Sequence, residues 1–139
     1  MSAEKIILDA IPFEFDEMKF RAQCRLPADG SLPAEISGMV AEAGKRATPR
    51  AMFRVLYIDG RGDDYIECAG VRLDSRVLRV NTEKVHRLFA YTATCGVELY
   101  RWAETVEGML ERYYADVLQT MALQCARKAV RDEIEHRFD

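Results

Sequence analysis

A strand that turns directly into a helix is the feature of this sequence that most constrains its fold. Residues 89–93 form an apolar run of the kind found in buried strands. Thr94, Cys95 and Gly96 then supply the small residues of a tight turn, and helical spacing begins at Val97. Such a turn leaves free backbone N–H groups at the helix start, where they can bind an anion or a carbonyl oxygen. The residues by themselves predict an α+β fold.

Length and charge narrow the class of protein. The chain has 139 residues, which predicts a single domain over residues 1–139. A net charge of −3 does not favour nucleic acid or an anionic membrane as a partner. We find no signal-peptide core and no apolar run near the ~20 residues of a membrane-spanning helix. The four cysteines form no C-x-x-C pair, which predicts a reduced, cytoplasmic protein without a metal site.

Elements before the turn are predicted from spacing and from proline and glycine. Lys5–Leu8 resembles an edge strand, residues 13–21 have a weak helical face, and residues 33–47 form an amphipathic helix that Thr48-Pro49 ends. Apolar alternation predicts a strand at 51–58, a hairpin loop at 59–64 and one partner strand at 65–73, kinked at Gly70. We further expect a short strand or an extended segment at 76–80, a helical turn capped by Asn81, and a strand at 88–93.

A long helix follows from Leu110 onward. Its apolar residues recur in a 3-and-1 spacing as far as Val130. This pattern repeats about every four residues, whereas a helix turns every 3.6 residues. The apolar stripe therefore drifts around the helix by about 40° per repeat. A helix with such a stripe needs more than one surface to cover it, which predicts a partner, a second copy, or a missing piece of chain. We find no glycine cap or proline stop before Asp139, so the helix is expected to continue.

Several residues could carry chemistry, each with a plainer structural explanation. Cys95 is the best nucleophile candidate, since a helix N-terminus lowers a thiol pKa, but no base accompanies it in sequence. Acidic residues between 59 and 67 lack the spacing of a calcium loop, and His86 and His136 lie far apart. Arginines on or near the strands could line a groove for phosphate or carboxylate groups: Arg50, Arg54, Arg72, Arg76 and Arg79.

Several segments together resemble the reactivation domain of cobalamin-dependent methionine synthase, and especially its short stand-alone relatives. The segments are Ser75–Asn81, Ala93–Leu99, Trp102-Ala103, Leu110–Asp116, and Pro49-Arg50 ahead of the Met52 strand. The resemblance implies a curved antiparallel sheet packed against helices, with a long C-terminal helix. It also implies a module without catalytic residues of its own, which docks on a corrinoid-binding methyltransferase. Cobalamin would then sit on the partner, and S-adenosylmethionine would be the family's methyl donor.

The resemblance places the docking or ligand-facing surface at the turn and the first turns of the long helix. The candidate residues are Thr94, Cys95, Gly96, Glu98, Tyr113, Tyr114 and Asp116. The family's S-adenosylmethionine motif, Arg-x-x-x-Gly-Tyr, is absent, and Thr120 stands near the place of an acidic ligand-binding residue. The chain is therefore expected to lack the C-terminal part of the family domain, and binding of S-adenosylmethionine is not carried over.

Two alternatives from other classes remain open. The first is a stand-alone enzyme or small-ligand-binding domain that uses Cys95 or the strand arginines. The second is a structural homo-oligomer that buries the drifting stripe of residues 110–130 against its own copy.

Overall fold

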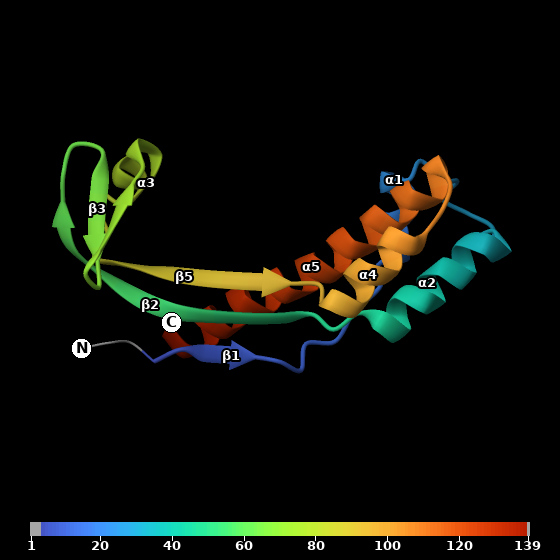
Figure 1. The fold of residues 1–139 in the computed structure, drawn as a ribbon, viewed down its shortest axis with the longest axis horizontal. Coiled ribbons are helices and arrows are strands. Elements are labelled where there is room, and N and C mark those ends of the chain that lie inside the picture. Colours follow the sequence, from blue (N-terminus) through green and yellow to red (C-terminus); the bar gives the residue numbers. More distant parts are fainter. Residues whose placement is uncertain (1–3, 139) are drawn as a thin grey trace. The chain divides into compact units, whose positions relative to one another are not determined.

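The computed structural model describes residues 4–138 and confirms an α+β fold with a long final helix (Figure 1). The elements in order are β1 (Ile6–Leu8), α1 (Glu17–Gln23), α2 (Ala34–Arg46), β2 (Arg50–Arg61), β3 (Tyr65–Cys68), β4 (Val71–Asp74), α3 (Arg76–Asn81), β5 (Arg87–Thr94), α4 (Val97–Thr105) and α5 (Met109–Phe138).

The described chain divides into two compact units, each made of two separate stretches. We call residues 4–6 and 52–92 the sheet unit, and residues 7–51 and 93–138 the helical unit. Each unit combines residues from distant parts of the sequence. The single domain over 1–139 stays a prediction.

The sheet confirms the predicted antiparallel pairing. Its strand order is β1-β2-β3-β4, with β5 also paired to β2. β2 runs antiparallel to β3, β3 runs antiparallel to β4, and Figure 1 shows β5 running opposite to β2. The register shifts between Ile58 and Gly60, where one extra residue of β2 forms a bulge. Such a bulge bends its strand and increases the local twist.

The predicted hairpin after β2 is confirmed, but the strand predicted over 65–73 is wrong. Gly62 N–H donates to the carbonyl oxygen of Tyr65 at 2.9 Å and closes the first turn. Residues 65–74 then form two strands, β3 and β4, rather than one. Ala69 and Gly70 join them with φ angles of 49° and 79°, as a two-residue hairpin turn requires. Gly70 therefore marks a reversal of the chain and not a kink.

The strand predicted over 76–80 is also wrong, because residues 76–81 form helix α3. The hydroxyl of Ser75 accepts a hydrogen bond from Leu78 N–H at 3.1 Å and caps the helix. Arg79 Nε donates to the Gly62 carbonyl oxygen at 2.7 Å and fastens α3 to the first hairpin. Asn81 ends this helix instead of starting a new turn. The β-branched valines of this segment favour a strand, and the cap by Ser75 favours the helix that forms.

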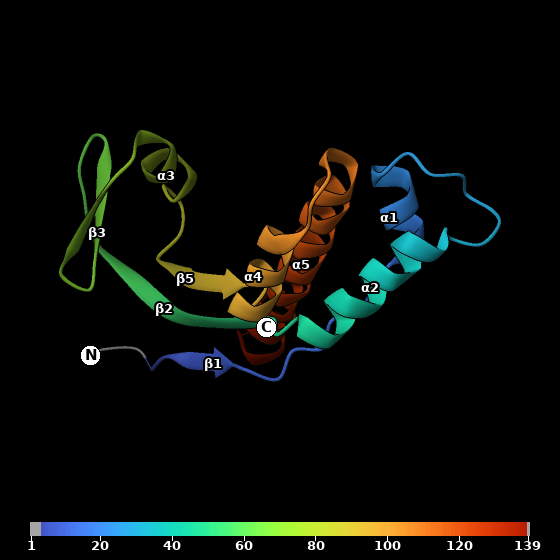
Figure 2. The same ribbon diagram turned by 45° about the vertical axis from the view of Figure 1, so that its right-hand side comes forward.

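In the helical unit, α2 and α4 contact each other and α5, and α1 contacts α5 (Figure 2). Phe20, Leu99 and Leu118 are fully buried at its centre. The predicted helices at 33–47 and from 110 onward are confirmed as α2 and α5. Buried residues of α5 recur at a spacing of four, as the drifting stripe predicted: Tyr114, Leu118, Ala122, Ala126 and Val130. The first turn of α5 is different, since Met109 is 93% and Leu110 57% exposed.

Arg21 of α1 holds the loop that connects α1 to α2. It is only 5% exposed, and its guanidinium donates to Glu17 and to the carbonyl oxygens of Pro27, Asp29 and Gly30 at 2.7–3.2 Å. Loss of hydrogen bonds made by a charged group costs about 1.5–3 kcal/mol. We expect Arg21→Met to lower the free energy of unfolding by about that amount in urea titrations.

Arg46→Met is the matched control for Arg21→Met. Arg46 also bonds the glutamate four residues before it at 3.0 Å, but this pair with Glu42 is exposed. Exposed pairs of this spacing contribute about 0.3–0.5 kcal/mol. Equal losses for the two variants would mean that Arg21 does not organise the loop.

Candidate docking surface

The turn between β5 and α4 is tightly packed, and it is formed as the sequence predicted. β5 ends at Thr94 and α4 begins at Val97. Gly96 adopts φ 97° and ψ 144°, and its N–H donates to the Thr94 hydroxyl at 3.0 Å. Thr48 N–H donates to the Cys95 carbonyl oxygen at 3.1 Å. A Cβ at Gly96 would lie 1.9 Å from Thr48 Oγ1, so only glycine fits here.

The chain itself supplies the anion that the start of α4 was predicted to attract. The Glu98 carboxylate accepts a hydrogen bond from its own backbone N–H and another from the Thr48 hydroxyl, the latter at 2.9 Å. These bonds lower the pKa of Glu98. A carboxylate in the first turn also interacts favourably with the helix dipole. The first turn of α4 is thus already occupied, which makes it a poor site for an external anion.

Cys95 lacks the environment of an activated nucleophile. Its side chain is partly buried and packs against the core of the helical unit. Burial raises the pKa of the Cys95 thiol, and hydrogen bonding lowers it less. The net shift is opposite to the lowered pKa that the helix start suggested, so the thiol stays protonated at neutral pH.

The structure divides the remaining predicted surface residues into exposed and buried ones. Thr94, Glu98 and Asp116 are exposed. Tyr113 is 43% exposed, and its hydroxyl donates to the Gln23 carbonyl oxygen at 2.9 Å. Tyr114 is 8% exposed and lies in the core, with its ring centre 6.2 Å from that of Phe20. Tyr114 therefore cannot face a partner.

Sequence reasoning identified Tyr113 but missed the exposed apolar residues Met109 and Leu110 beside it. Met109, Leu110 and Tyr113 lie within the first two turns of α5, and we call them the α5 apolar patch. Val97 and Tyr100, which are 50% and 53% exposed, lie three residues apart on α4. The sequence signal for the start of α5 is Gly108, which directly precedes Met109 and adopts φ 94°. The stripe spacing alone had counted Leu110 among the covered residues.

Three of the strand arginines in the sheet unit have separate surroundings. Arg72 pairs with Asp74 at 2.8 Å and lies 3.7 Å above the Tyr65 ring centre. Arg79 is bound to the Gly62 carbonyl oxygen, as described above. Arg54 lines a pocket between β2 and β5. Within residues 4–138 we also find no group of three or more histidine, cysteine or acidic residues able to hold a metal ion.

Thr120 does not offer a ligand group in place of the family's acidic residue. Its hydroxyl donates to the backbone carbonyl oxygen of Asp116 at 3.0 Å, within α5. A hydroxyl engaged in this way has no negative charge to attract an amino group.

No family model matches the chain, and no curated protein matches it. For the part of the chain that the structure describes, no helix combines the length and the apolar character needed to cross a membrane.

Proposed function

We propose that the chain is a non-catalytic module that docks on a cobalamin-bearing methyltransferase, as its resemblance to the reactivation domain implies. The observation that carries the proposal is the α5 apolar patch, because it lies in the segment that the resemblance assigns to docking. Met109, Leu110 and Tyr113 are 93%, 57% and 43% exposed. Contiguous exposed apolar side chains on a folded protein are typical of interaction surfaces.

The patch is supported by a rigid base, which favours binding without rearrangement. The next apolar residues of α5, Tyr114, Val117 and Leu118, are buried in the core of the helical unit. The Tyr113 hydroxyl bonds to the end of α1, so the orientation of its ring is fixed. A pre-oriented tyrosine buries a large area with little loss of conformational entropy.

Charged residues near the patch suit the edge of an interface. Asp116 is exposed on α5, one turn after Arg112, which is also exposed. Interfaces of this kind bury an apolar centre and leave polar groups around it, where they contribute to specificity. The raised pKa of the Cys95 thiol counts against its use as a nucleophile.

The test is a titration of the protein with a cobalamin-loaded corrinoid module of a methionine synthase. We expect wild-type protein to bind with a dissociation constant of tens of micromolar, read from the cobalamin absorbance and from calorimetry. Leu110→Glu should weaken binding about tenfold or more, because it places a charge in the apolar centre of the interface. Leu110 is 57% exposed, so the variant should still fold.

Val77→Glu is the matched control, since Val77 is 70% exposed but lies on α3 of the sheet unit. It should bind like wild type. A flat titration at tens of micromolar would overturn the proposal. Self-association in light scattering that Leu110→Glu abolishes, without corrinoid binding, would instead support the homo-oligomer.

A further inference from the structure

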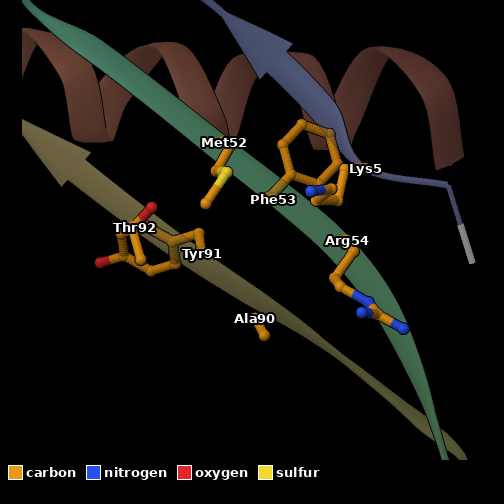
Figure 3. Close-up of a pocket in the computed structure, with 7 residues that line it drawn as sticks. All are labelled: Lys5, Met52, Phe53, Arg54, Ala90, Tyr91 and Thr92. Carbon is orange, nitrogen blue, oxygen red and sulfur yellow. The ribbon is translucent and has the colours of Figure 1, made fainter. Parts of the chain in front are cut away.

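One pocket of the sheet unit is lined by an arginine with an unpaired donor atom. It is lined by Lys5, by Met52, Phe53 and Arg54 of β2, and by Ala90, Tyr91 and Thr92 of β5 (Figure 3). Its volume is about 170 Å³. The lining holds two cations and no carboxylate, and most of its wall is apolar.

The Nε atom of Arg54 makes the pocket unusual. Among residues 4–138 it is the only buried side-chain nitrogen or oxygen without a hydrogen-bond partner. Folded proteins pair nearly all such groups, because an unpaired buried donor is costly. Arg72 and Arg79, by contrast, use Nε to bond Asp74 and the Gly62 carbonyl oxygen. Arg54 thus has donor capacity that its own fold leaves unused.

We propose that this pocket binds a small organic anion with a compact apolar body, such as an aryl carboxylate. A turn of the flexible Arg54 side chain would present Nε–H and one Nη–H to a carboxylate in the paired geometry that guanidinium groups favour. Lys5 adds a second positive charge to the lining.

The size and wall of the pocket define the rest of the ligand. A cavity of about 150 Å³ is enough for a benzene ring, and drug-sized ligands need about 300 Å³ or more. Met52, Phe53 and Ala90 provide apolar contacts, and Tyr91 and Thr92 add hydroxyl groups. The apolar wall favours a ring over a bare inorganic anion. The pocket lies wholly within the sheet unit, so this inference does not depend on the docking proposal.

The experiment follows the side-chain Nε–Hε signals of the arginines by ¹⁵N NMR during titration with benzoate. We expect the Arg54 signal to shift and saturate, with a dissociation constant in the millimolar range or below, while the Arg76 signal stays in place. Arg76 is exposed and does not line the pocket. Benzamide, which has the ring without the charge, and acetate, which has the charge without the ring, should each bind at least tenfold more weakly.

Variants separate this site from non-specific binding. Arg54→Met should reduce benzoate affinity at least tenfold and still fold, since it removes an unpaired donor and keeps the apolar stem. Lys5→Met should reduce affinity several-fold, and Arg76→Gln should leave it unchanged. An unmoved Arg54 signal would overturn the proposal. Equal binding of benzamide would overturn the role of charge, and equal binding of acetate or inorganic phosphate would overturn the role of the ring.

Discussion

Replacing Gly96 by alanine is expected to lower the free energy of unfolding by about 2–6 kcal/mol, from backbone strain of about 1–3 kcal/mol and steric overlap of about 1–3 kcal/mol. Gly96 has φ 97° and ψ 144°, a combination that is almost confined to glycine. The new Cβ would lie 1.9 Å from Thr48 Oγ1 and 2.9–3.0 Å from two Thr48 backbone atoms. The backbone at Thr48 is held by Cys95, so it cannot move without breaking that bond.

Urea unfolding followed by Trp102 fluorescence measures this loss. Trp102 is the single tryptophan and packs against the core of the helical unit, to which Gly96 also belongs. Gly38→Ala is the control with the opposite sign. Gly38 lies in α2 with nothing within 4 Å of an added Cβ, so alanine should stabilise the helix by about 0.5–1 kcal/mol. A Gly96→Ala protein as stable as wild type would show that the turn is loose.

The turn at Gly96 was predictable because its signal is local. Small residues between an apolar run and a helical pattern specify a strand-to-helix turn without help from the rest of the chain. The same holds for α2, which begins after Pro33 and ends before Thr48-Pro49. The fold class followed from these local signals. The pairing of β2 with β3 followed from the alternation of side chains along β2 and from the loop at 59–64.

The errors lie where two local signals compete. Val77 and Val80 have a high strand propensity, yet the hydroxyl of Ser75 caps a helix over residues 76–81. Ala69-Gly70 forms a hairpin turn that requires two positive φ angles, and alanine rarely signals one. A short segment with balanced propensities is decided by its capping residue and its packing, which a pattern of apolar positions does not contain.

The candidate site was predictable only in outline. The segment 110–116 was identified, but the pattern could not show that Tyr113 is exposed while Tyr114 is buried beside Phe20. Adjacent helical residues point about 100° apart. The packing of α5 against Phe20 of α1 therefore decides which of the two tyrosine rings is covered. The hydrogen bonds of the Glu98 carboxylate and the unpaired Nε of Arg54 also depend on atomic positions. The spacing of residues in the sequence does not predict them.

Phe20→Ala is expected to lower the free energy of unfolding by about 3–5 kcal/mol, as truncation of a buried phenylalanine does when a cavity remains. Phe20 is fully buried, and its ring lies 5.4 Å from that of Phe15 and 6.2 Å from that of Tyr114 between centres. It is the largest buried side chain of α1, a helix of seven residues. So short a helix is not stable alone and depends on this anchor.

The loss should extend to the proposed docking surface, because the hydroxyl of Tyr113 is held by the last residue of α1. If Phe20 anchors α1, Phe20→Ala should weaken binding of the corrinoid module at temperatures where the protein is still folded. Met18→Ala is the control on the same helix: Met18 is 63% exposed, so stability should change by less than about 0.5 kcal/mol and binding should stay the same. Weaker binding in both variants would place α1 itself in the interface. Normal binding by a destabilised Phe20→Ala protein would show that the α5 apolar patch does not need α1 to hold Tyr113.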